Sequence, residues 1–168
     1  MEKVTMMASH IVSGILILVL SGCAQTVGHF TPAVASNPNN TTFYIYRPAA
    51  TSVGLMKPLK YDYPDILIDG KSIGVLKYEK YLVAELPPGA HKVTITGLTT
   101  AASGWAKRDI EQVIPASQSK QVFMKLRVEY DLNKMTLEHP GSKYIINLTS
   151  VDGENAKYEI RNSTPANN

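Results

Sequence analysis

Cysteine is almost absent from this chain. Among 168 residues there is a single cysteine, Cys23, so no disulfide can form within the chain. Exported domains of modest size are often stabilised by disulfides. A domain without them must be held together by side-chain packing, and its length is sufficient for a hydrophobic core.

A hydrophobic run long enough to cross a membrane is also missing from the N-terminal region. The apolar stretch Ile11–Leu20 is about ten residues long, whereas a membrane-spanning helix needs roughly 20 apolar residues. The hydrophobic part of a secretory signal needs only about 7–15. The stretch is followed by small residues and ends at Gly22, directly before Cys23. Its length predicts a signal peptide over residues 1–22.

Clusters of charge of one sign are the third absence. The 17 Lys and Arg residues and 14 Asp and Glu residues give a net charge of +3. The basic residues are dispersed and at most paired, as in Lys107–Arg108. Nucleic-acid-binding domains usually gather their basic residues in a patch or stripe. We therefore expect no nucleic-acid partner.

Amphipathic helical patterns are absent too, and short strand patterns are found instead. Asp69–Gly70 separates two β-branched runs and predicts a two-residue hairpin, while Pro88–Gly89 suits the centre of a type II turn. We expect about seven to nine short antiparallel strands, which predict an all-β sandwich or barrel. The segments with strand patterns are 42–47, 65–68, 72–76, 81–86, 91–96, 109–114, 119–129, 134–138, 144–151 and 156–161. In 119–129 the alternation places Val122, Met124, Leu126 and Val128 on one face.

The two ends of the mature chain differ in composition from its centre. Residues 23–41 are rich in small and polar residues and predict a flexible tether, with a reach of roughly 20–25 Å for eighteen residues. Residues 42–161 are the size of one domain. The polar residues 162–168 predict a disordered tail.

The run Leu20-Ser21-Gly22-Cys23 resembles the bacterial lipobox. The resemblance implies cleavage between Gly22 and Cys23 and acylation of the Cys23 sulfur, which would anchor the chain in membrane lipid. The acylated sulfur is a thioether, which removes it from metal binding and nucleophilic catalysis. In a host with two membranes, Ala24 resembles a signal for sorting to the periplasm-facing side of the outer membrane, because the usual retention signal at this position is an aspartate. The alternative is an ordinary signal peptide with an unrelated cysteine.

A second resemblance covers the centre of the chain. Several segments in order are similar to a group of small bacterial lipoproteins that share a domain of unknown function. These segments are Phe43–Pro48, Ile68–Gly74 and Leu86–His91. The Pro-Gly-x-His-x-Val part is also similar to PEGA-type surface domains, which implies an immunoglobulin-like or transthyretin-like sandwich. Ala49–Pro64 and Leu98–Arg108 depart from the pattern.

Candidate catalytic residues form no recognisable motif. His29, His91 and His139 lack a second ligand at the spacing that metal sites use, so we expect no metal and no cofactor. His91 follows a turn and is expected to bond a turn carbonyl through a ring nitrogen. Paired carboxylates of the kind that hydrolyse glycosides stay open, because several acids lie around the predicted turns. We expect the chain not to be an enzyme.

Aromatic residues supply the candidate partner-binding positions. Tyr61, Tyr63 and Tyr81 lie around the predicted hairpin, and Trp105, the only tryptophan, lies in the loop Gly97–Arg108. Aromatic side chains with polar tips are enriched at recognition surfaces. The alternative for the tyrosines is packing of a sheet. Trp105 has two alternatives, as a plug at one end of the sandwich or as a contact with lipid headgroups.

These patterns predict a non-catalytic lipoprotein of the bacterial cell envelope that binds a protein or glycan partner near the membrane. One alternative is a hydrolase or inhibitor directed at peptidoglycan, which would need convergent polar residues in a cleft. Another is an envelope assembly component that docks through an exposed strand edge.

Overall fold

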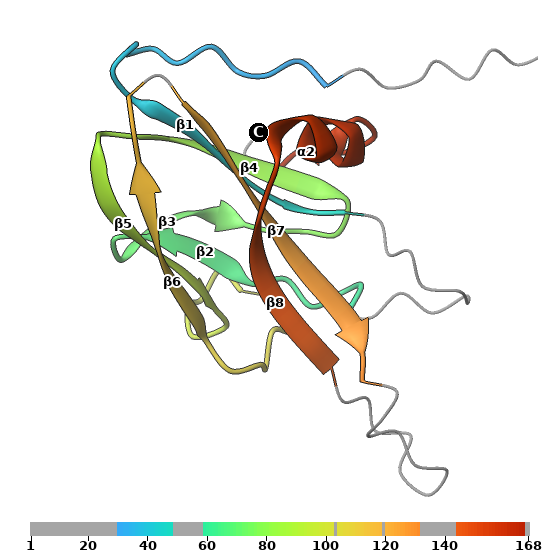
Figure 1. The fold of residues 1–168 in the computed structure, drawn as a ribbon. Coiled ribbons are helices and arrows are strands. Elements are labelled where there is room, and N and C mark those ends of the chain that lie inside the picture. The colour runs from blue at the N-terminus through green and yellow to red at the C-terminus, as the bar shows by residue number, and fades with distance from the viewer. Residues whose placement is uncertain (1–29, 49–58, 103, 119, 132–143, 167–168) are drawn as a thin grey trace, which may run out of the picture.

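Two β-sheets and one short helix make up the part of the chain that the structure describes (Figure 1). The structure is a computed structural model that describes residues 30–48, 59–102, 104–118, 120–131 and 144–166. The predicted signal peptide, Cys23 and the expected strand 134–138 lie outside these residues. No helix in the described part of the chain is long and apolar enough to cross a membrane.

The first sheet is mixed and the second is antiparallel. The five-stranded sheet has the order β8-β7-β1-β4-β9, and the four-stranded sheet has the order β3-β2-β5-β6. The strands of the first sheet are β1 Thr41–Arg47, β4 Lys80–Leu86, β7 Gln121–Tyr130, β8 Tyr144–Val151 and β9 Thr164–Pro165. Those of the second are β2 Asp65–Ile68, β3 Lys71–Val75, β5 Gly89–Thr96 and β6 Ile110–Ala116.

The expectation of purely antiparallel strands is wrong for two pairs. Strand β1 runs parallel to β7, with Thr42 opposite Gln121, and β4 runs parallel to β9. Parallel neighbours need a long crossover between them. The chain supplies one by building β4 and the whole second sheet between β1 and β7.

The two predicted turns have different outcomes. Asp69 (φ 50°) and Gly70 (φ 81°) both have positive φ, as a type I′ hairpin between β2 and β3 requires, so that prediction is confirmed. Gly89 has φ 149°, outside the value of about +80° for the type II position. The reason is that Pro87–Pro88 carries the chain from β4 in one sheet to β5 in the other.

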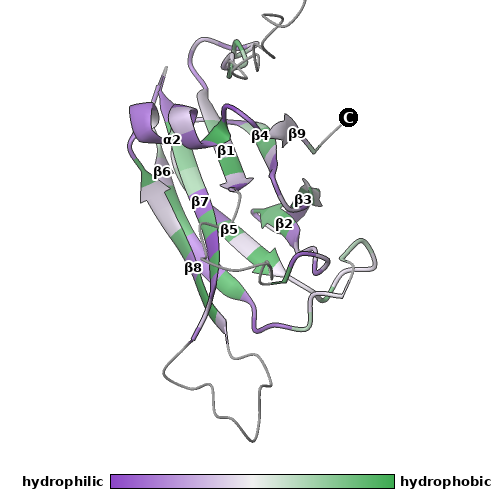
Figure 2. Cartoon of the chain, turned by 90° about the vertical axis from the view of Figure 1, so that its right-hand side faces the viewer, coloured by the Kyte–Doolittle hydropathy of each residue, from purple (hydrophilic) through white to green (hydrophobic). Residues whose placement is uncertain are grey.

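The hydrophobic core lies between the two sheets. It joins Phe43, Ile45 and Leu82 of the first sheet to Ile66 and Ile95 of the second. Hydrophobic residues alternate with polar ones along many of the strands (Figure 2). Strand β7 follows this rule: the inward residues are Val122, Met124, Leu126 and Val128, as the sequence predicts.

A second hydrophobic cluster covers the outer face of the five-stranded sheet. Tyr44, Tyr46 and Phe123 point to this side and pack with Ala156 and Ile160. These last two belong to the helix α2, Gly153–Ile160, which replaces the strand expected at 156–161. The helix begins because the Asp152 carboxylate accepts hydrogen bonds from the backbone N–H groups of Glu154 and Asn155.

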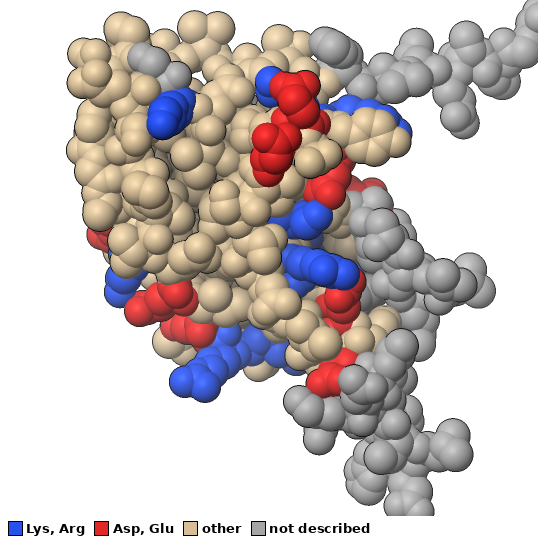
Figure 3. Space-filling view, in the orientation of Figure 1, with Lys and Arg blue, Asp and Glu red and all other residues tan. Residues whose placement is uncertain are grey.

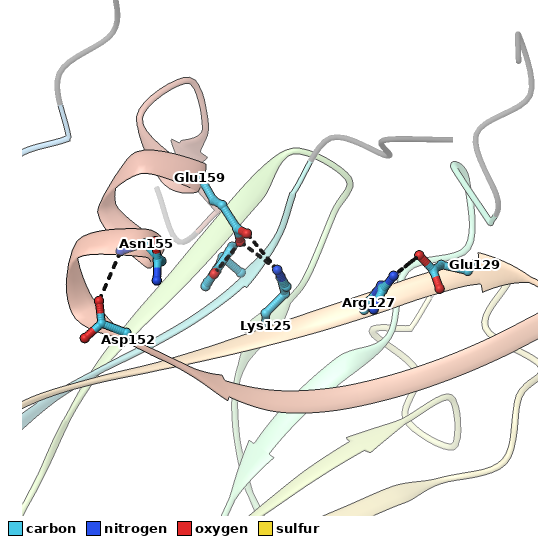
Figure 4. Close-up of polar contacts among 7 residues, drawn as sticks. Lys125, Arg127, Glu129, Asp152, Asn155 and Glu159 are labelled. Carbon is cyan, nitrogen blue, oxygen red and sulfur yellow. Dashed lines mark hydrogen bonds and ion pairs between the residues drawn. The ribbon is translucent and has the colours of Figure 1, made fainter. Parts of the chain in front are cut away.

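A buried side of α2 is fixed by Glu159 (Figure 4). Its carboxylate accepts a hydrogen bond from the Tyr46 hydroxyl at 2.7 Å and pairs with the Lys125 ammonium at 2.7 Å. Burial and the neighbouring Glu159 carboxylate raise the pKa of Tyr46, so the phenol stays protonated and can donate. The helix is thereby tied to both β1 and β7.

The segment before β1 packs against the sheet. Phe30 is buried with its ring edge-on to those of Tyr44 and Tyr81, each 5.5 Å away between centroids. The Glu85 carboxylate accepts hydrogen bonds from the backbone N–H and the hydroxyl of Ser36, and these lower the pKa of Glu85. Residues 30–40 of the expected tether are therefore attached to the domain at Phe30, Ala33 and Ser36, while most of the segment is exposed.

The C-terminal residues extend the sheet. Thr164–Pro165 form β9, and the Ala166 N–H donates to the Tyr81 carbonyl at 2.8 Å. The described part of the expected disordered tail is thus a short edge strand, because the end of α2 places it beside β4.

We expect Phe30→Ala to lower the free energy of unfolding by about 2–4 kcal/mol, because it removes a buried ring and its edge-on contacts. Urea denaturation of the full chain measures the change. Val34→Ala is the matched control, since Val34 is 93% exposed and its truncation should alter stability by less than about 0.5 kcal/mol. Equal effects of the two changes would contradict the packing of this segment.

Candidate functional site

Two of the predicted loops meet at one end of the domain. Tyr63 and Gly104 form a parallel bridge, which joins the segment before β2 to the loop between β5 and β6. Gly104 has φ 70°, and a Cβ there would approach the Asp62 carboxylate to 3.0 Å. A side chain at position 104 would therefore strain the junction that holds the two loops together.

Trp105 lies beneath this junction. Its side chain is 4% exposed and belongs to the core between the sheets, so it packs as a plug in the described structure. A Cβ at position 97 would overlap the Trp105 carbonyl oxygen, so only glycine fits at this position. Within the described residues the Trp105 Nε1 has no hydrogen-bond partner.

The exposed residues at this end are tyrosines and lysines. Tyr61 is 72% exposed, with the Lys60 Nζ 5.2 Å from its ring centroid. Tyr63 is half-buried, with the Lys77 Nζ 6.0 Å from its ring. We call these four residues the tyrosine–lysine rim. Cation–π pairs at exposed sites contribute only about 0.5–1 kcal/mol each, which leaves the rings accessible to a partner.

Arg47 forms a rigid base under the rim. Its guanidinium is buried and donates hydrogen bonds to the backbone carbonyls of Asp62, at 2.8 Å, and of Leu59. It also lies over the ring of Tyr78, 5.3 Å from the centroid. Desolvation lowers the pKa of Arg47 to about 10, against the opposing effect of Tyr78 and Asp62, so it stays charged at neutral pH. The two carbonyl contacts fix the segment that carries Tyr61.

Tyr81 lies apart from the rim. It projects from β4 onto the outer face of the five-stranded sheet, beside Phe30 and Tyr44. Burial raises the pKa of Tyr81. The structure therefore brings Tyr61, Tyr63 and Trp105 together and separates Tyr81 from them, while Gly22 and Cys23 lie outside the described residues.

His91 joins the two predicted turns. Its Nε2 is 2.8 Å from the Pro87 carbonyl oxygen, which confirms the expected contact with a turn carbonyl, and its Nδ1 is 2.7 Å from the Asp69 carboxylate. Both nitrogens face acceptors, so the doubly protonated ring fits best. The hydrogen bond to Asp69, followed by that to Pro87, raises the pKa of His91, and the same contact lowers the pKa of Asp69.

Asp65 is a buried carboxylate that the sequence patterns did not single out as a functional residue. It accepts hydrogen bonds from the Ser72 hydroxyl at 2.6 Å and the Thr99 hydroxyl at 2.7 Å. These contacts tie β3 and the Trp105 loop to β2. The spacing of Asp65 and Ser72 around the hairpin indicates a cross-strand contact. Thr99, the other hydrogen-bond donor, is 34 residues from Asp65 in the sequence, and no local pattern points to it.

The surface shows no dominant charge on the visible face. Basic and acidic groups are interspersed there, with broad uncharged areas between them (Figure 3). Among the described residues, no three His, Cys, Asp or Glu side chains are grouped as metal ligands.

Comparisons with protein families, with curated proteins and with solved structures gave no match. The resemblance to small bacterial lipoproteins therefore stays a prediction.

The His91–Asp69 pair predicts a specific pH dependence. The pKa of His91 is raised in the folded state, so its protonated ring stabilises the fold. This stabilisation is complete below the pKa of about 6.5 that His has in the unfolded chain. It is lost as pH rises through the higher pKa of the folded state. The free energy of unfolding, measured with urea, should fall from pH 6 to pH 8.5.

The variant His91→Gln should flatten this part of the profile, and Asp69→Asn should reduce it by removing the carboxylate partner. NMR titration of the ring measures the pKa of His91 directly. An unchanged pH profile in both variants would show that other groups control stability in this range.

Proposed function

We propose that this chain is a lipid-anchored protein of the bacterial cell envelope, a non-catalytic module that binds a protein or glycan partner from an immunoglobulin-like or transthyretin-like sandwich. The lipobox pattern at Cys23 supports the anchor and the envelope location. The two facing sheets with a shared core support the sandwich class.

The observation that carries the binding role is the tyrosine–lysine rim on its fixed base. Tyr61 is exposed although its backbone is fixed by Arg47 on one side and the Tyr63–Gly104 bridge on the other. An aromatic ring held this way loses little conformational entropy on binding. Leu98, 88% exposed in the adjoining loop, adds an apolar group that a partner can cover.

The chemistry of the rim suits a partner with both apolar and polar groups. Tyrosine rings offer flat faces for stacking and a hydroxyl for hydrogen bonding. Lys60 and Lys77 add positive charge beside the rings. Sugar rings and aromatic or acidic side chains of an envelope protein all match this combination.

The alternative of a hydrolase finds less support in the positions of the carboxylates. Asp65 bonds Ser72 and Thr99, Asp69 bonds His91, and Glu159 bonds Lys125. Each of the three is engaged in holding two structural elements together. The strand-edge alternative is favoured by one specific feature, the edge strand β8, which contains no charged residue and no proline.

Replacement of the anchor residue tests the location. We expect the Cys23→Ala variant to be either soluble or unprocessed, because it has no thiol to acylate. Fractionation followed by metabolic labelling with a fatty acid measures both effects. Unchanged membrane association together with labelling of the variant would contradict the lipoprotein assignment.

A photo-reactive amino acid at position 61 tests the rim as a contact surface. We expect crosslinked adducts in cells from this position and few from position 113, since Val113 is also well exposed, at 64%, but lies on β6. Cosedimentation with purified cell-wall glycan, compared between the parent and Tyr61→Ala, tests a glycan partner. Adducts no more frequent from position 61 than from position 113, together with unchanged cosedimentation of Tyr61→Ala and Tyr63→Ala, would remove the rim from the proposal.

A further inference from the structure

The edge strands of the two sheets are protected to different degrees. Unpaired edges present free N–H and C=O groups, and proteins block them with proline, charge, bulges or short length. Strand β9 has two residues including Pro165, and β6 contains Glu111 and Pro115. Strand β3 begins with Lys71 and pairs with β2 through an irregular register. Three of the four edges therefore carry such a device.

Strand β8 is the fourth edge, and it carries none of these devices. Tyr144–Val151 is eight residues long and contains no proline and no charged residue. It pairs with β7 in a regular antiparallel register along its whole length. An edge of this kind is a template for another strand.

We infer that β8 pairs with β8 of a second copy of this chain, antiparallel and across a two-fold axis at Asn147. This extends the strand-edge alternative but does not depend on the lipid anchor or on the rim. An interface on a two-fold axis brings a surface against itself, so the surface must be self-complementary. A strand with no charged residue meets this condition, because no like charges are brought together at the axis.

An axis at Asn147, near the middle of Tyr144–Val151, keeps most of the two strands opposed. Tyr144, Ile146 and Leu148 face the core, whereas Val151 packs with the cluster on the outer face. Two copies keep both faces aligned only when residues of the same parity stand opposite each other. With Asn147 opposite itself, Ile146 meets Leu148 of the second copy, and Tyr144 meets Ser150. The apolar row of the core then continues across the junction.

The charges that β7 places next to the edge are already paired on their own subunit, and the Lys107 ammonium lies 5.0 Å from the ring centroid of Tyr144. Arg127, opposite Asn147 on β7, donates to the Glu129 carboxylate at 2.7 Å, and Lys125 pairs with Glu159 (Figure 4). The two copies of Arg127 would be separated by three strand spacings, about 14 Å. That exceeds the screening length of about 8 Å at physiological salt, so their repulsion is small.

A pair of cysteine substitutions tests the partner and the register together. Asn147→Cys places two thiols opposite each other, and directly opposed Cβ atoms lie about 4.5–5.5 Å apart, near the range for a disulfide. Thr149→Cys places its thiols about 13 Å apart along the strands. We expect mild oxidation of the full chain to give a reducible dimer for Asn147→Cys and only the parent background for Thr149→Cys.

A charge at the axis gives an independent test. Asn147→Lys should convert the full chain from dimer to monomer in light scattering, and Val113→Lys on β6 should not, while circular dichroism checks that both variants fold. A monomeric parent across micromolar concentrations would overturn the inference. Equal crosslinking at positions 147 and 149, or a dimer that survives Asn147→Lys, would also overturn it.

Discussion

The burial of β1 on both faces is the constraint on which the rest of this structure depends. All seven residues from Thr41 to Arg47 are buried, which is unusual for a strand in a two-layered domain. Phe43 and Ile45 fill the core between the sheets, and Tyr44 and Tyr46 fill the cluster outside. A strand that buries both faces needs cover on both, so the helix and the N-terminal segment are required by the composition of β1.

The polar groups of β1 connect that cover to the sheet. The Tyr44 hydroxyl accepts a hydrogen bond from the Ala33 N–H at 2.7 Å, and the Tyr46 hydroxyl donates to Glu159. Arg47, the last residue of β1, holds the loop that carries Tyr61. Because buried polar groups without partners cost about 1–3 kcal/mol each, these three contacts also explain how β1 can be buried at all. One strand thus positions the helix, the N-terminal segment and the rim.

Local patterns in the sequence predicted the local structure well. The Asp69–Gly70 hairpin, the inward residues of β7 and the contact of His91 with a turn carbonyl all depend on neighbours within a few residues. The parallel pairing of β1 with β7 joins residues about eighty positions apart, and no periodicity encodes it. The helix α2 was missed because it is short and has only two buried positions, Ala156 and Ile160. The candidate site shows the same division, since the meeting of Tyr63 with Gly104 results from the tertiary fold.

The packing of Phe30 against the sheet changes the mechanical relation between this domain and an anchor at Cys23. Only six residues, 24–29, would then separate Cys23 from Phe30, the first packed side chain, and the seven steps between them extend to at most about 25 Å. This connecting segment joins the domain on the outer face of the five-stranded sheet, where Phe30 packs on Tyr44 and Tyr81. With Cys23 acylated as proposed, so short a connection would restrict the rotation of the domain relative to the bilayer. Its helix-bearing side would stay turned toward the bilayer, and its four-stranded sheet would point into the surrounding compartment.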